Sequence, residues 1–247
     1  MADFRNYNAR VAGAGTRADA GIDEGLRSYM LKVYNLMALG LAITGLAAWG
    51  SFNLAVADGQ LTGFGQLIYA SGFRWVVILA PLAMVFFLSF RVHTMSVAAA
   101  QATFWAYAAL VGLSLSTIFL VYTGESIVQT FFITATAFGS LSLYGYTTKR
   151  DLSGLGSFMV MGLFGIIIAM IVNIFLQSSA LQFAISGIGV LVFAGLTAYD
   201  TQSIKEMYFE GDDDVVAGRK AIMGALRLYL DFLNLFMFLL QFLGNRE

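Results

Sequence analysis

Long apolar runs dominate this sequence, and each is about as long as a segment that crosses a bilayer. A transmembrane helix needs about 20 predominantly apolar residues to cross a hydrocarbon core about 30 Å thick. Seven runs meet this requirement, at residues 30–52, 73–90, 97–122, 126–147, 154–177, 181–203 and 221–243. The alternating pattern of a β-barrel is absent, and the runs are about twice as long as a barrel strand needs. The sequence therefore predicts an all-α integral membrane protein, folded as a seven-helix bundle.

Composition excludes most other classes of protein. Charged residues make up 12% of the chain and hydrophobic residues 59%, against about 25% and 45–50% in soluble domains. So few charges cannot cover a water-facing surface, which excludes a soluble enzyme. The absence of cysteine excludes thiol nucleophiles and Cys-ligated zinc, and the single histidine, His93, excludes multi-His metal sites. We expect no enzyme activity, no cofactor, no stable metal site and no nucleic-acid partner.

Two regions differ in polarity. Residues 1–29 are polar and contain no apolar stretch that could serve as a cleavable signal peptide. We expect them to form a flexible cytosolic tail, followed by a seven-transmembrane-helix domain at residues 30–247.

The distribution of basic residues predicts the orientation of the spans. With the N-terminus in the cytosol, twelve of the fourteen Lys and Arg residues fall on the cytosolic side, and only Arg74 and Arg246 fall on the other. This is a strong positive-inside signal. Seven spans then place the C-terminus on the periplasmic or extracellular side of the cell inner (plasma) membrane.

Glycine is abundant within the apolar runs, where it permits helices to approach closely. The positions are Gly40, Gly45, Gly112, Gly139, Gly162, Gly165, Gly187, Gly189 and Gly195. Ala135 and Gly139 have the spacing of a small-xxx-small pair, which predicts tight helix packing there.

Three ionisable residues lie within the last two runs, where an isolated charge costs about 3 kcal/mol on insertion scales. They are Asp200, Arg227 and Asp231. The acidic stretch that begins at Gly211 and continues to Gly218 is read as the turn between the two helices. Both aspartates then lie at similar heights on the cytosolic side, where they could face each other. A merely structural Arg227–Asp231 ion pair is the alternative.

A polar face runs along most of the last apolar run. Arg227, Asp231, Asn234, Phe238 and Gln241 recur at intervals of four, three, four and three, so they share one helical face. Such a face cannot face lipid, so this helix is expected near the centre of the bundle, with Asn234 and Gln241 lining a pore or polar stripe.

Two nearby carboxylates in a low-dielectric site cannot both ionise cheaply, so they titrate as a unit. The pair is a candidate pH-sensitive latch. Deprotonated, it is a hard oxygen site that could bind calcium loosely. We therefore interpret Asp200 and Asp231 as a transient calcium or proton site and, with Arg227, as the gating residues.

Several segments resemble the bacterial branch of the Bax inhibitor-1 family. They are Ala198 to Lys205, Leu228 to Phe236, Lys149 to Ser153 and Val172 to Phe175, within a resemblance that covers roughly residues 25–247. The resemblance implies a seven-helix bundle whose last helix is wrapped by the other six. It implies a pH-sensitive calcium leak channel with an aspartate pair as the sensor, which corresponds here to Asp200 and Asp231. A relative carries a Glu in span two, whereas Ile78 to Ala83 contains no acid here.

Two other functions remain open at this stage. Some bacterial relatives restrain a membrane-anchored AAA protease, so the chain could be a non-conducting modulator that binds such a partner. Co-purification with a protease without ion flux would favour that reading. The third reading is an intramembrane aspartyl protease, but Leu228-Tyr229-Leu230 stands where those enzymes carry Gly-x-Gly before the aspartate.

Overall fold

The computed structural model describes the backbone of residues 2–245 and the side chains of residues 24–245. Seven long helices are apolar enough to cross a membrane within this part of the chain. They are α1 (Ala2–Ala55), α3 (Arg74–Arg91), α4 (Val97–Leu115), α5 (Gly124–Thr147), α6 (Ser153–Leu176), α7 (Ser179–Glu206) and α8 (Asp214–Leu243). The predicted all-α architecture and the seven spans are confirmed.

The remaining elements are short and lie between spans. The connection from α1 to α3 contains a two-stranded hairpin, β1 (Val56–Ala57) and β2 (Gln60–Leu61), then α2 (Gly63–Gly65) and the π-helical η1 (Gln66–Ala70). The hairpin turns at Asp58-Gly59, and both residues have positive φ angles (51° and 74°), as a tight two-residue turn requires. Two 3-10 segments extend spans: η2 (Val92–Thr94) follows α3, and η3 (Ser116–Leu120) follows α4.

Four of the seven long helices begin at a side chain that caps their first turn. Ser96, Thr123, Ser178 and Asp213 accept hydrogen bonds from backbone N–H groups at the starts of α4, α5, α7 and α8. Such caps satisfy donors that have no partner within the helix. Because a capped helix can begin directly after a connector, a short connector is enough to reverse the chain. Consecutive spans therefore run antiparallel.

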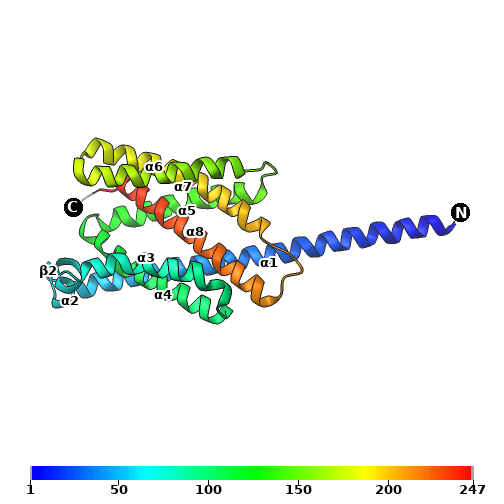
Figure 1. The fold of residues 1–247 in the computed structure, drawn as a ribbon, viewed down its shortest axis with the longest axis horizontal. Helices are drawn as coiled ribbons and strands as arrows, with labels where there is room; N and C mark the ends of the chain where they lie inside the picture. The colour runs from blue at the N-terminus through cyan, green and yellow to red at the C-terminus, as the bar shows by residue number, and fades with distance from the viewer. Residues whose placement is uncertain (1, 246–247) are drawn as a thin grey trace.

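Helix α8 is the central helix of the bundle. It crosses the molecule diagonally between the α3–α4 and α6–α7 pairs (Figure 1). It packs on α1, α4, α5 and α7, while α3 packs on α4 and α6 packs on α7 from outside. In its most apolar segment 61% of residues are buried, against 39% for α7 and 6% for α6. The predicted central C-terminal helix is therefore confirmed, with four close neighbours rather than six.

The two chain ends lie at opposite ends of the bundle (Figure 1). The α3–α4, α5–α6 and α7–α8 connectors lie at the same end as the start of the first span. This end carries Arg91, Lys149, Arg150 and Lys220, and we call it the basic end. The side of the membrane that it faces stays a prediction.

The predicted tail, residues 1–29, falls mostly outside the residues whose side chains are described. Within its last residues, Tyr29 is buried and Leu26 packs against the core. The flexibility of the tail and the boundary at residue 30 stay predictions.

Glycines differ in the role that the structure gives them. At Gly112 a Cβ atom would overlap the backbone of Thr44, so this glycine permits the close α1–α4 contact. Gly145 likewise lies against the carbonyl group of Ala198 and brings α5 close to α7. Gly139 faces open space, so the predicted tight packing at the Ala135–Gly139 pair is wrong for the glycine.

Replacing Gly145 with Ala should destabilise the bundle, because the new methyl group would overlap the Ala198 backbone, which cannot move as a side chain does. We expect a loss of about 1–3 kcal/mol, typical of overpacking. Gly139→Ala, six residues earlier on the same helix, is the matched control and should be neutral or slightly stabilising. Thermal unfolding of the two variants in detergent measures the difference. Equal melting temperatures would contradict the packing described here.

Candidate functional site

The structure brings the two intramembrane aspartates together. Asp200 lies near the end of α7, and Asp231 lies near the middle of α8. Both side chains line one cavity, where their carboxyl groups are close enough to interact directly. Asp231 is buried, with 4% of its surface exposed, and Asp200 is half-buried. A carboxyl–carboxyl hydrogen bond requires a proton, so the pair can hold one proton between two helices.

The two aspartates meet for a different reason from the one that the sequence suggests. The predicted turn from Gly211 to Gly218 is wrong in its second half, because α8 begins at Asp214. The first turns of α8 reach the α3–α4 connector, where Arg219 Nε donates to the carbonyl oxygen of Met95 (2.7 Å). Helix α8 crosses the bundle diagonally (Figure 1), and its Gly224 lies against Ile204 of α7, so Asp231 comes beside Asp200 further along the same contact.

Arg227 lines the same cavity as the two aspartates but is exposed. Within the described part of the chain it forms no ion pair, and the ion pair that is present joins Lys220 to Asp212. The structure therefore does not show the Arg227–Asp231 ion pair that the sequence left open. Arg227 acts on both carboxyl groups through electrostatic attraction at longer range.

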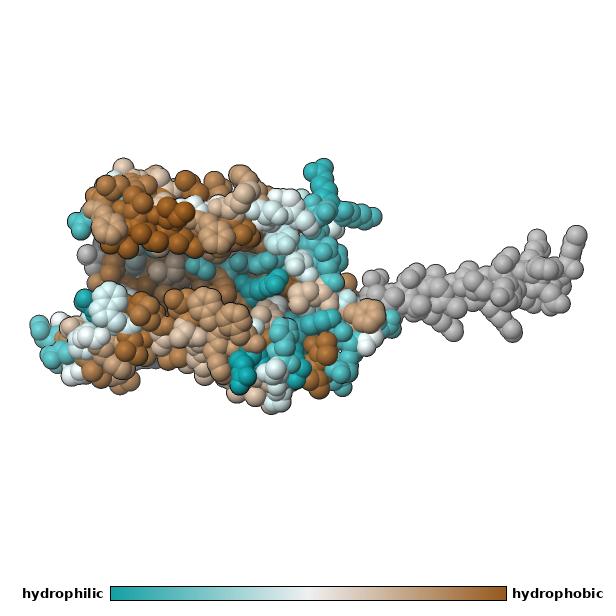
Figure 2. All heavy atoms as spheres, in the orientation of Figure 1, coloured by the Kyte–Doolittle hydropathy of each residue, from teal (hydrophilic) through white to brown (hydrophobic). Residues whose placement is uncertain are grey.

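The pair opens onto a cavity of about 530 Å³ between α6, α7 and α8, which we call the dyad cavity. Its polar lining consists of Tyr199, Asp200, Arg227, Asp231 and Asn234, and its other walls are apolar. Hydrophilic atoms lie in the hollow along α8, between the hydrophobic surfaces of α6 and α3 (Figure 2). The few polar groups converge on the α7 and α8 walls of an otherwise apolar cavity, as in sites that orient a ligand by a small number of polar contacts.

The polar face of α8 lies toward α7 along much of its length. Asn234 and Phe238 line the dyad cavity with Asp231. Gln241 lies beyond it, where its Oε1 accepts from Gln182 Nε2 (2.8 Å) and from Ser186 Oγ (3.3 Å) of α7. The stripe from Asp231 to Gln241 therefore lies toward α7 and the dyad cavity, whereas Arg227 at its start is exposed. That the stripe lines a pore stays a prediction.

An aromatic pair interrupts the polar face. The ring of Phe238 stacks on that of Phe193, with centroids 5.7 Å apart. The same ring covers Gly189, where a Cβ atom would overlap it. The aspartate pair and the amide cluster around Gln241 are therefore separated by a short apolar barrier.

Sequence reasoning missed the hydroxyl and amide contacts that fix the surroundings of the pair. Ser142 Oγ shares hydrogen bonds with Tyr34 (2.6 Å) and Thr201 (2.9 Å), which links α1, α5 and α7. Gln202 holds the α5–α6 connector, because its Nε2 donates to Arg150 O and its Oε1 accepts from Leu152 N (both 2.8 Å). Hydroxyl groups in membrane helices often bond to their own helix, so the sequence pattern gives no sign of these contacts.

No three His, Asp or Glu side chains lie close enough to hold a metal ion within the described residues. A divalent cation at the pair would have two carboxylates and would otherwise keep its water ligands. Oxygen Oδ2 of Asp231 is buried and has no hydrogen-bond partner among the described groups.

Comparison with known proteins identifies the family of this chain. The sequence profile of the family described as "Inhibitor of apoptosis-promoting Bax1" matches residues 26–247. An uncharacterised protein of Rickettsia prowazekii is 50% identical over 94% of this chain and 95% of its own. The inner membrane protein YbhL of Escherichia coli is 47% identical over 90% of this chain and 94% of its own. The chain therefore belongs to the Bax inhibitor-1 family of multi-pass membrane proteins.

Proposed function

We propose that the protein is a pH-sensitive cation leak channel, with calcium as the main ion, gated by the Asp200–Asp231 pair. The observation that carries this proposal is the contact of two carboxyl groups across α7 and α8, at the head of a polar helix face. Buried ionisable groups in a membrane span are costly, and they commonly mark ion or proton pathways. We further place it in the cell inner membrane, as for YbhL, with the basic end in the cytosol.

The closed state holds one proton shared between Asp200 and Asp231. Full ionisation at higher pH removes this shared hydrogen bond, and full protonation at lower pH replaces it with a weaker bond between neutral groups. Two ionised carboxylates also repel each other and attract a cation. A change of about 1.4 kcal/mol in the balance between closed and open states changes their ratio tenfold, so the loss of one charge-assisted hydrogen bond is enough to open the protein.

The route that we propose follows the polar face of α8 from the aspartate pair to Gln241. In the closed state the stacked rings of Phe193 and Phe238 block it. Opening requires the ring of Phe238 to move away from Gly189. A small separation of α7 from α8 would make room for this movement. The site offers calcium few carboxylate ligands, so binding is weak enough for the ion to leave again.

An enzyme role has less support. Leu228 and Tyr229, the residues before Asp231, are fully buried against other helices. A substrate strand therefore has no access to Asp231 from that side, and we propose no catalytic role.

Neutralising Asp231 should change the pH response of calcium flux more than neutralising Asp213. In the wild type, calcium flux should change in two steps across pH, one for each proton of the pair. Asp231→Asn leaves one titratable carboxyl group, so this response should become a single step or disappear. Asp213→Asn is the matched control, because Asp213 caps α8 by accepting from Val216 N (2.7 Å) and Asn caps equally well. Calcium efflux from proteoliposomes across a pH series measures both variants. Equal effects would remove the aspartate pair as the sensor.

The proteoliposome assay also separates this proposal from the non-conducting alternative. If the wild-type protein is folded and inserted but gives no flux at any pH, and it co-purifies with a membrane-anchored AAA protease, the chain is a modulator of that protease.

Replacing Arg227 with Gln should shift the midpoint of calcium flux to higher pH. The carboxyl groups lose a nearby cation that favours their charged form, so ionisation of the pair needs a lower proton concentration. Because Arg227 forms no ion pair within the described residues, its charge acts on the carboxyl groups only across the dyad cavity, and we expect a shift of under about one pH unit. Arg91→Gln, at the exposed α3–α4 connector, serves as the control. An unchanged midpoint for Arg227→Gln would mean that the pair titrates independently of this cation.

A further inference from the structure

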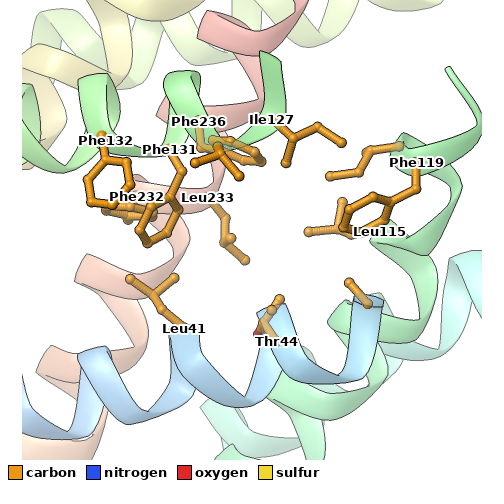
Figure 3. Close-up of a pocket in the computed structure, with 14 residues that line it drawn as sticks. Leu41, Thr44, Leu115, Phe119, Ile127, Phe131, Phe132, Phe232, Leu233 and Phe236 are labelled. Atoms are coloured by element: carbon orange, nitrogen blue, oxygen red, sulfur yellow. The ribbon is translucent and has the colours of Figure 1, made fainter. Parts of the chain in front are cut away.

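Helices α1 and α5 are neighbours that leave a gap between them. Helix α1 packs mainly on α4 and α8, and α5 packs mainly on α7 and α8. Two cavities lie in this gap. One, of about 290 Å³, is enclosed by Leu41 and Thr44 of α1, by Phe131 and Phe132 of α5, and by residues of η3 and α8 (Figure 3).

The second cavity, which we call the α1–α5 groove, has a volume of about 570 Å³ and lies nearer the basic end. Its walls are mainly apolar, with Met30, Met37 and Ala38 on α1 and Phe138 on α5. At its rim Leu31 and Leu143 are 52% and 62% exposed. Since both helices span the membrane, the groove opens sideways to the hydrocarbon of the bilayer rather than to water.

The end of the groove at the basic end is polar and positively charged. Arg27 lines it and is exposed. Tyr146 lines it from α5, and the ammonium group of Lys205 lies over the Tyr146 ring (5.4 Å) and donates to the Tyr146 carbonyl oxygen (2.8 Å). An apolar groove that ends at two cations matches a molecule with a hydrocarbon chain and an anionic head.

The dimensions of the groove decide between a lipid chain and a partner helix. Its α1 wall runs from Arg27 to Ala38, about 16 Å at 1.5 Å per residue, or about half of a hydrocarbon core about 30 Å thick. The groove therefore has the depth of one leaflet, which matches the acyl chain of a lipid, whereas a transmembrane helix needs a contact surface across the whole hydrocarbon core.

We propose that the α1–α5 groove binds one anionic phospholipid from the leaflet at the basic end. An acyl chain lies between α1 and α5, and the phosphate lies against Arg27 and Lys205. The wall of this site includes Ser142, which bonds to Thr201 beside Asp200. The lipid therefore contacts the hydroxyl network that surrounds the aspartate pair, but the proposal does not depend on ion conduction.

Filling the groove with a side chain tests the proposal without breaking the fold. Gly139 lines the groove, and a Cβ atom added there meets nothing within 4 Å. Gly139→Leu should therefore place a side chain in the space of the acyl chain. Gly165→Leu is the matched control, since Gly165 is also free of neighbours, lies within α6 and is exposed. Both changes should favour the helix, because Leu is a better helix former than Gly.

Native mass spectrometry of the full-length protein, released from mild detergent, measures how much added phosphatidylglycerol stays bound. We expect one phosphatidylglycerol on the wild type and on Gly165→Leu, and at least a tenfold loss for Gly139→Leu. Equal retention by the two leucine variants, or no retained lipid on the wild type, would overturn the proposal.

The head-group contact has its own test. We expect the wild type to prefer phosphatidylglycerol over phosphatidylcholine with the same acyl chains. Arg27→Gln should reduce that preference about fivefold, as expected for one basic residue near an anionic lipid head. Arg91→Gln, at the same end but outside the groove, should leave it unchanged. An equal effect of the two substitutions would show that only the general charge of the basic end attracts lipid, and would refute the assigned site.

Discussion

The approach of the carboxyl groups of Asp200 and Asp231 between the last two helices is the interaction on which the proposed gating depends. Both groups lie where water is scarce, so neither side chain can be held cheaply without the other. A single shared proton would join the two groups, although Oδ2 of Asp231 has no hydrogen-bond partner among the described groups. Because the two groups lie on different helices, we propose that their state of protonation changes how closely α7 and α8 pack.

Other contacts hold α8 in place on its remaining sides. Tyr229 is fully buried, and its hydroxyl shares a hydrogen bond with Thr44 of α1 (2.6 Å). The rings of Phe104 and Tyr107 of α4 meet Tyr229 edge-on. Residues two apart on a helix do not face the same side, so these contacts and Asp231 hold α8 from different directions. The α1 and α4 side has no ionisable partner in these contacts, which leaves the α7 side as the one that pH can change.

Much of this arrangement can be predicted from the sequence. The spans follow from apolar length, and the inward face of α8 follows from the spacing of Asp231, Asn234 and Gln241, because both signals are local. The extent of the α7–α8 turn could not be predicted, since an acidic stretch suits both a turn and the first turn of a helix. The position of Arg227 depends on the direction in which a long side chain extends at the mouth of a cavity. The open space at Gly139 depends on a gap between α1 and α5, which are distant in sequence. Neither leaves a local pattern.

The proposed gating requires one movement, the separation of α7 from α8 when the aspartate pair no longer shares a single proton. Ile204 of α7 lies against Gly224 of α8, and the chain contains no cysteine. A variant with Ile204→Cys and Gly224→Cys can therefore be cross-linked at this one place. Calcium efflux from proteoliposomes across pH should vanish when the disulfide is formed and return when it is reduced. Efflux with the same pH profile in the oxidised and reduced forms would contradict the account.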